Sequence, residues 1–151
     1  MEQALAVRAS HVPETSRSGI ARALVQAGDE FDVDPLFLLA VAEEESRVRP
    51  DARSRRNALG LMQIRPVTAR AVALRYGILW REEGQLFDPT FNARIGAAYL
   101  AELHERFDSW DLALTAYSHG PRKARQLRDR DPSSRYAAGV LRRYDELTAF
   151  R

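Results

Sequence analysis

Apolar residues recur along this chain with the period of an α-helix. Between residues 18 and 31, the side chains of Ile20, Leu24 and Phe31 fall on one stripe together with small alanines. Intervals of three and four residues place side chains on one helix face, because a turn takes about 3.6 residues. No segment shows the sustained alternation of apolar and polar residues that predicts a strand. The chain is therefore predicted to be all-α.

The clearest helix start in the chain opens a segment that is apolar all round. Asp34 can cap a helix, Pro35 suits its first position, and Val33 can pack against Leu38 across the cap. Residues 36–42 are apolar on every side, which is typical of a helix surrounded by the rest of the protein. We expect this helix to lie buried at the centre of the domain.

The remaining segments predict one irregular loop and four further helices. Residues 49–65 are mostly polar and form the loop. The predicted helices that follow span residues 66–76, 88–107, 111–117 and 133–148. Together with the first two helices they predict a single domain over residues 18–151. We expect residues 1–17 to be a flexible N-terminal segment.

Length and composition narrow the class of protein. The chain has 151 residues, enough for one domain with a sizeable core, and no cysteine, which excludes disulfides and thiol catalysis. No apolar run approaches the roughly 18 to 20 residues of a membrane span, and residues 1–18 lack the features of a secretory signal. His11, His104 and His119 are scattered, so we predict neither a metal site nor a cofactor.

Basic residues concentrate in the C-terminal part of the chain, although the net charge is only +2. From His119 to Arg151, nine arginines and lysines stand against four acidic residues. Such a patch can attract a polyanion such as a nucleic acid. The mixing of both signs is more typical of a solvated helix face, and no DNA-reading motif is present. We therefore predict no specific nucleic-acid partner.

Three consecutive glutamates, Glu43, Glu44 and Glu45, end the predicted buried helix. The helix dipole is negative at this end, and burial penalises a charged carboxylate. Both effects raise a carboxyl pKa, which is what a general acid near neutral pH requires. Every face of the helix is apolar, so periodicity does not select one of the three. The alternative is that all three pair with nearby arginines at a solvated helix end.

Four short motifs in the chain resemble those of the soluble lytic transglycosylase family, whose members have a goose-type, lysozyme-like fold. The resemblance covers residues 33–144, including an Asp-Pro start at residue 88, Asn92, and the stretch of residues 96–100. The motifs, in chain order, are Glu45-Ser46, Gly60-Leu61-Met62-Gln63, Ala116-Tyr117-Ser118 with Gly120-Pro121, and Tyr136.

The resemblance implies a catalytic role for Glu45 among the three glutamates. It implies cleavage of the β-1,4 bond between N-acetylmuramic acid and N-acetylglucosamine in peptidoglycan. Glu45 would donate a proton to the leaving oxygen and then take one from the C6 hydroxyl, leaving a 1,6-anhydromuramyl end. The glycan strand is the expected partner. A monomer that acts outside the cytoplasm is expected, with the catalytic glutamate on the buried central helix of a lysozyme-like domain.

The resemblance also implies a set of substrate-binding residues. Ser46 is expected to hydrogen-bond either the carboxyl group of the neighbouring Glu45 or the peptide stem of the muramyl sugar. Gly60 is expected to let the loop backbone approach a sugar closely. Gln63 is expected to bind an acetamido or hydroxyl group, and Tyr117 to offer a phenol and a flat ring face. The complete expected set is Ser46, Gly60, Met62 (through its backbone), Gln63, Tyr117, Ser118 and Tyr136.

The sequence leaves open alternatives to the transglycosylase reaction. Most glycosidases need two carboxylates, and the second candidate here, Asp51, is better explained as a turn residue after Pro50. A facing Asp51 would favour a hydrolytic muramidase, and a non-catalytic cell-wall binding module is a further alternative. Ser118 stands where the family usually has asparagine, and residues 132–135 replace its usual Glu-Thr pair.

Overall fold

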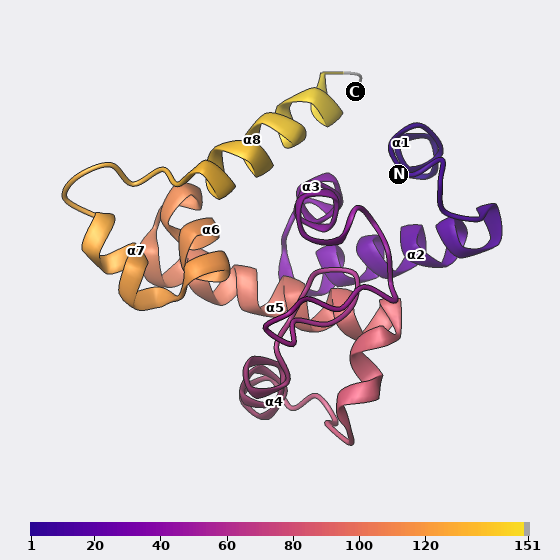
Figure 1. The fold of residues 1–151 in the computed structure, drawn as a ribbon, viewed down its shortest axis with the longest axis horizontal. Coiled ribbons are helices and arrows are strands. Elements are labelled where there is room, and N and C mark those ends of the chain that lie inside the picture. Colours follow the sequence, from indigo (N-terminus) through magenta and orange to yellow (C-terminus); the bar gives the residue numbers. More distant parts are fainter. Residues whose placement is uncertain (150–151) are drawn as a thin grey trace.

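The computed structural model describes residues 1–149, and these residues form helices joined by turns and loops (Figure 1). No strand is formed among them, and the all-α prediction is confirmed. The last two residues of the predicted domain, Phe150 and Arg151, lie outside the described part. The elements are α1 (Glu2–Arg8), α2 (Glu14–Phe31), α3 (Pro35–Ser46), α4 (Pro66–Arg75), the 3-10 helix η1 (Glu83–Phe87), α5 (Pro89–Phe107), α6 (Trp110–His119), α7 (Pro121–Leu127) and α8 (Arg135–Thr148).

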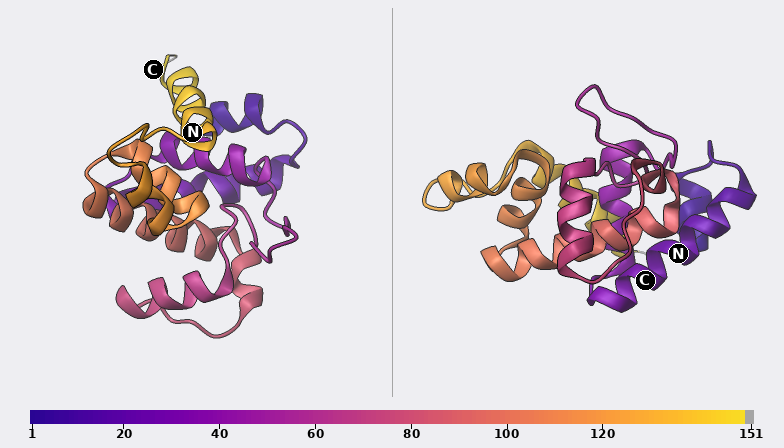
Figure 2. Two further views of the ribbon diagram at one scale, coloured as in Figure 1. Left: turned by 60° about the vertical axis from the view of Figure 1, so that its left-hand side comes forward. Right: turned by 90° about the horizontal axis from the view of Figure 1, so that it is seen from below.

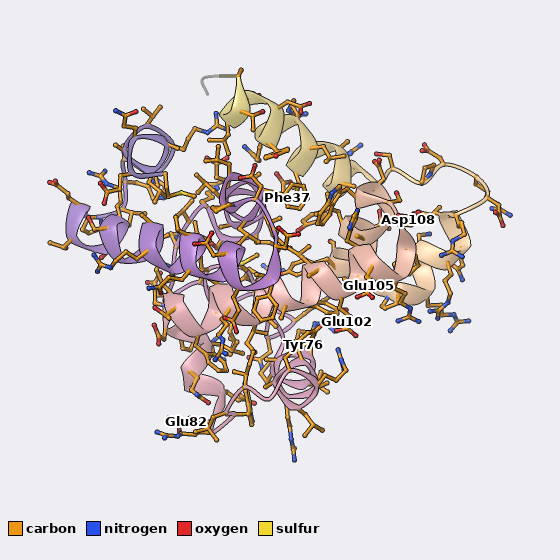
Figure 3. All side chains as sticks on the ribbon, turned by 180° about the vertical axis from the view of Figure 1, so that it is seen from behind. Phe37, Tyr76, Glu82, Glu102, Glu105 and Asp108 are labelled. Atoms are coloured by element: carbon orange, nitrogen blue, oxygen red, sulfur yellow. The ribbon has the colours of Figure 1, made fainter. Side chains whose placement is uncertain are left out.

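Helix α3 lies at the centre of the molecule, between α8 on one side and the α2–α5 pair on the other (Figure 1). The Asp34 side chain accepts a 2.9 Å hydrogen bond from the backbone N–H of Leu36, which confirms the predicted cap. Residues 37–42 of the helix are all buried. Phe37 packs against Trp110 of α6 and Tyr144 of α8, at ring distances of 4.4 and 5.3 Å (Figure 3).

The loop after α3 projects from the helical body yet has a defined structure (Figure 2). Leu59 forms isolated bridges with Arg53 and with Ile64, so the chain doubles back on itself. Asn92 of α5 holds the loop in place through hydrogen bonds, and its side chain is fully buried. Its Oδ1 accepts from the N–H of Met62 at 2.8 Å, and its Nδ2 donates to the carbonyls of Leu59 and Leu86 at 2.9 and 2.8 Å.

We predict that Asn92→Ala destabilises the protein by about 2 kcal/mol or more. The substitution removes the side-chain partner of the buried Met62 N–H and of the Leu86 carbonyl, while the Leu59 carbonyl keeps its bond from the N–H of Ile64. Leaving buried polar groups unpaired costs about 1–3 kcal/mol. Urea unfolding measures the change in the free energy of unfolding. As a control, Gln126→Ala removes an exposed side-chain amide on α7, and a change below about 0.5 kcal/mol is expected there. Equal stability of the Asn92→Ala variant and the parent would contradict this role.

Residues 1–17, expected to be a flexible segment, are largely helical in the structure. Residues 2–8 form α1, Leu5 is fully buried, and α2 begins at Glu14 instead of residue 18. Arg8 extends from α1 to carboxylates of both α3 and α8. Helix α1 is too short for its few apolar residues to give a clear helical period. Its contact with the core stabilises the helix instead.

Two further boundaries differ from the prediction. Helix α6 begins at Trp110, one residue before the predicted start at residue 111, because the Ser109 hydroxyl caps it by accepting from the N–H of Leu112 at 3.2 Å. The predicted helices leave residues 118–132 as a connection, but Pro121 starts α7 within it, since proline suits the first helical position.

Candidate active site

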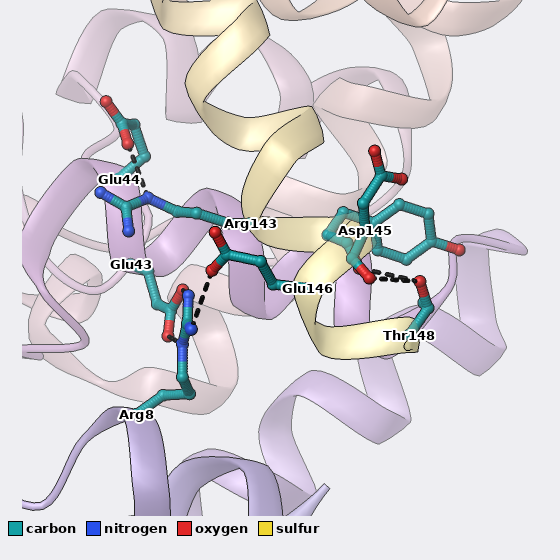
Figure 4. Close-up of polar contacts among 8 residues, drawn as sticks. Arg8, Glu43, Glu44, Arg143, Asp145, Glu146 and Thr148 are labelled. Carbon is teal, nitrogen blue, oxygen red and sulfur yellow. Dashed lines mark hydrogen bonds and ion pairs between the residues drawn. The ribbon is translucent and has the colours of Figure 1, made fainter. Parts of the chain in front are cut away.

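The three glutamates at the end of α3 point to three different partners. Glu43 accepts from Nε and Nη2 of Arg8 at 2.8 and 3.0 Å, and Glu44 accepts from Nε of Arg143 at 2.7 Å (Figure 4). Among the described residues Glu45 forms no ion pair, and its Oε1 accepts from the Tyr136 hydroxyl at 2.7 Å. The solvated-end alternative therefore fails for Glu45, because it is the one of these three glutamates that pairs with no cation within residues 1–149.

Burial raises the pKa of Glu45 from 4.5 to about 7. The hydrogen bond from Tyr136 stabilises the carboxylate and opposes this rise, while the nearby negative charge of Glu44 adds to it. The carboxyl is therefore substantially protonated near neutral pH and can also act as a base after losing its proton. The sequence predicted a raised pKa at this helix end, and the burial of Glu45 supplies the largest cause.

Glu45 opens onto a groove of about 730 Å³ that brings together residues from the α3–α4 loop, α4, α5 and α6. Glu45 is the only acidic residue lining this groove within residues 1–149, and Asp51 is not part of its wall. The lining residues are Glu45, Ser54, Arg55, Arg56, Ala58, Gln63, Ile64, Arg65, Thr68, Tyr99, Ala116, Tyr117, Ser118, His119, Gly120 and Pro121.

Two tyrosines hold the acid and the loop in place. Tyr136 reaches Glu45 from α8, and the Tyr117 hydroxyl donates to the carbonyl of Met62 at 2.8 Å. Burial, followed by the negative charge of Glu45, raises the pKa of both phenols well above the usual value. Both hydroxyls therefore remain hydrogen-bond donors across the pH range in which Glu45 titrates.

Three of the expected substrate contacts are replaced by structural ones. Ser46 is 3% exposed, and its hydroxyl donates to the carbonyl of Leu61 at 2.6 Å, so it ties the loop to α3 instead of facing the groove. Gly60 has φ +79, and a Cβ there would collide with the Leu86 carbonyl, so close packing against η1 requires the glycine. The Met62 carbonyl is bound by Tyr117, and its side chain is fully buried.

Gln63 and Ser118 do line the groove, as does Tyr117. The Gln63 backbone is left-handed at φ 52, and its Nε2 donates to the carbonyls of Ala52 and Gly60 at 3.1 and 3.0 Å. These bonds use its amide donors and leave Oε1 without a hydrogen-bond donor among the described residues. Gln63 is thus positioned to accept from a ligand N–H or O–H. The exposed Ser118 hydroxyl stands at the far wall, on α6.

Sequence reasoning missed Tyr99, Thr68 and the arginines of the groove wall. Tyr99 belongs to the matched stretch of residues 96–100, yet nothing in its local sequence separates a groove tyrosine from a core one. Its ring lies 5.5 Å from that of Tyr117, so the two form one aromatic surface. Within residues 1–149, no cluster of three His, Cys, Asp or Glu side chains is placed to hold a metal ion. No helix in that range has both the length and the apolar character of a membrane span.

We predict that Tyr136→Phe raises the pKa of Glu45 above its parent value of about 7. The hydroxyl of Tyr136 stabilises the ionised carboxylate, so its removal favours the protonated form. An NMR titration of the labelled Glu45 side-chain carboxyl measures the change. Tyr144→Phe is a matched control, because that hydroxyl lies on the same helix but binds Asp34 at 2.8 Å. A downward shift in Tyr136→Phe would contradict the assigned hydrogen bond.

Comparison with known proteins identifies the family to which this site belongs. The sequence model of the transglycosylase SLT domain matches residues 22–138, which include every lining residue of the groove. The chain belongs to the transglycosylase SLT domain family. The expectation of a resemblance to soluble lytic transglycosylases is confirmed.

Sequence similarity to individual proteins supports this family assignment. The soluble lytic murein transglycosylase of Salmonella typhimurium is 35% identical over 96 residues, which cover 62% of this chain and 15% of that protein. The endo-type membrane-bound lytic murein transglycosylase A of Salmonella paratyphi B is 42% identical over 82 residues, covering 52% of this chain and 39% of that protein. The chain therefore spans well under half the length of either relative.

A solved structure confirms the lysozyme-like fold class expected from the sequence. The lytic transglycosylase Slt of Pseudomonas aeruginosa, in an inactive glutamate-to-glutamine mutant, superposes with a TM-score of 0.76 at 31% identity. The match covers 85% of this chain and 24% of that one.

Proposed function

We propose that this chain is a peptidoglycan lytic transglycosylase that cleaves the β-1,4 bond between N-acetylmuramic acid and N-acetylglucosamine. The observation that carries the proposal is one carboxyl group, Glu45, with a pKa near 7 in a groove that holds no second acid within residues 1–149. The names of the relatives and the family support the same reaction class.

Glu45 acts first as an acid and then as a base. In its protonated form it donates to the glycosidic oxygen as the bond to the anomeric carbon breaks. The acetamido group of the muramyl sugar stabilises the positive anomeric carbon, so no protein nucleophile is required. The ionised Glu45 then removes the proton of the C6 hydroxyl as that oxygen bonds to the anomeric carbon. The product is a 1,6-anhydromuramyl end, and Glu45 returns to its protonated form.

The other groove residues position the sugar. The Oε1 atom of Gln63 accepts from an N-acetyl N–H or a sugar hydroxyl, and the Tyr99–Tyr117 surface packs against a ring face. Ser118 provides a hydroxyl where related enzymes usually have an amide. Because the glycan lies outside the cytoplasm, we also propose that the chain acts in the cell envelope or beyond it.

Mass spectrometry of digested peptidoglycan tests the proposal. Transglycosylation is expected to release muropeptides with anhydro ends, about one water lighter than the reducing ends that hydrolysis makes. Reducing ends in place of anhydro ends would make the chain a hydrolytic muramidase. Absence of any cleavage by correctly folded protein, with retained binding to cell-wall sacculi, would make it a non-catalytic binding module.

A further inference from the structure

Three arginines line the loop side of the groove without a counter-charge. Arg55 and Arg56 lie near the tip of the α3–α4 loop, and Arg65 immediately precedes α4. All three are exposed, and their side chains form no ion pair or hydrogen bond with any residue between 1 and 149. Other exposed arginines, such as Arg22, Arg70 and Arg142, also form no ion pair within residues 1–149, but they lie on three different helices and outside the groove. What distinguishes Arg55, Arg56 and Arg65 is that they line the same groove.

The groove therefore has a strong charge asymmetry. Glu45, the only acid that lines it within residues 1–149, is largely uncharged in the form that begins the reaction, whereas the three guanidinium groups are cationic. Like charges gathered on one wall repel one another and add nothing to the stability of the fold. Their presence is explained by a ligand that carries negative charge along the same groove.

The loop holds two of these arginines in a defined position. The Ser54 hydroxyl accepts from the N–H groups of Arg56 and Ala58 at 3.2 and 3.0 Å, and Asn57 adopts the left-handed conformation at φ 60. Gln63 ties the base of the loop through the carbonyl of Ala52. The cationic groups thus project from an ordered turn, which lowers the entropy cost of binding a ligand.

We infer that Arg55, Arg56 and Arg65 bind carboxylate groups of the stem peptides carried by the muramyl sugars, and so make this chain prefer peptide-bearing glycan strands. The inference rests on the proposed function. The sugar backbone offers only neutral hydroxyl and acetamido groups, whereas the peptides attached to it bear carboxylates. A planar guanidinium group donates two parallel hydrogen bonds to a carboxylate, which suits this pairing.

A kinetic comparison of charge on the protein and charge on the substrate tests the inference. The variant Arg55→Gln/Arg56→Gln/Arg65→Gln removes the cationic wall. The control variant Arg22→Gln/Arg70→Gln/Arg142→Gln removes three exposed arginines that lie outside the groove and form no ion pair within residues 1–149. Both variants lower the formal net charge from +2 by three, to −1, so they differ only in where the charge is lost.

Three substrates are compared: native peptide-bearing strands, the same strands with their carboxylates converted to amides, and strands stripped of peptides by an amidase. For native strands, the groove variant is expected to raise KM about tenfold with little change in kcat, since three exposed ion pairs are lost. The control variant is expected to match the parent. On amidated strands, parent and groove variant are expected to have the same KM.

Each outcome separates the inference from its alternatives. An equal rise in KM for both variants would show a general electrostatic attraction between the protein and peptidoglycan, and it would overturn the inference. An undiminished groove effect on stripped strands, which keep only the lactyl carboxylate, would assign the arginines to that group and overturn the peptide assignment. A parent enzyme that cleaves native and amidated strands equally well would overturn the inference while the proposed function stands. Cleavage of none of the three substrates by the parent would overturn the proposed function itself.

Discussion

Glu45→Gln is expected to lower turnover of peptidoglycan about a thousandfold or more, with little change in substrate binding. The amide still accepts the hydrogen bond from Tyr136, so the local packing is preserved, but it can neither donate the required proton nor accept one later. A positioned acid or base contributes about 10²–10⁴ in rate, and here one residue performs both steps. Release of soluble muropeptides from purified sacculi measures the loss.

Glu43→Gln is the matched control for this variant. It makes the same isosteric change on the same helix two residues away, but Glu43 does not line the groove and binds Arg8 instead. Turnover per folded molecule is expected to stay within a few-fold of the parent, and circular dichroism establishes the folded fraction. Comparable turnover by the Glu45→Gln variant and the parent would remove Glu45 from the mechanism.

Glu45→Gln is also expected to stabilise the protein at alkaline pH by about 3 kcal/mol. The folded-state pKa of Glu45, about 7, lies above the value of 4.5 that applies to the unfolded chain. Below about pH 4.5 both states are protonated, and Glu45 costs nothing. As pH rises through the window from 4.5 to 7, the unfolded chain loses its proton first, so stability falls. Above pH 7 the full difference between the two pKa values is reached, which corresponds to about 3 kcal/mol.

Denaturant unfolding at pH 4 and pH 8 measures this effect. The parent and Glu45→Gln are expected to have similar free energies of unfolding at pH 4 and to separate at pH 8, with the variant more stable. Glu43→Gln is expected to change in the opposite direction at pH 8, because it breaks the 2.8 Å ion pair with Arg8. Parallel pH profiles for the parent and Glu45→Gln would mean that the carboxyl is not desolvated in the folded state.

The opposite signs expected for these two neighbours reflect their different surroundings. Glu43 and Glu44 bind the cations of Arg8 and Arg143, whereas Glu45 is half-buried and accepts from the hydroxyl of Tyr136. An uncompensated acid is a cost to folding, and that cost is retained where a proton must be donated near neutral pH. The same feature thus explains both the proposed activity and the predicted loss of stability.

Local sequence determined those parts of the fold in which the signal lies within a few residues. Asp34 and Pro35 specify the start of α3 through a cap and a fixed φ, and the apolar run after them specifies its burial. The Asp88-Pro89 pair specifies the start of α5 in the same way. The chemistry of the helix end, with acids next to an apolar segment, was sufficient to predict a raised carboxyl pKa, and the motif resemblance singled out Glu45 as the proposed acid.

Tertiary contacts decided everything that depends on residues distant in sequence. Arg8 and Arg143 lie 35 and 99 positions from the glutamates they bind. Sequence therefore could not show that, of the three consecutive glutamates, Glu45 is the one that pairs with no cation within residues 1–149. Ser46 and Gly60 carry motif support as ligand contacts, yet the positions of Leu61 and Leu86 make them structural. Local sequence determined the helices, because capping and periodicity act within a few residues, whereas only the motif resemblance pointed to Glu45. Only folding decided which polar groups are paired, which are buried and which face the groove, because those properties belong to neighbours that the chain brings together from afar.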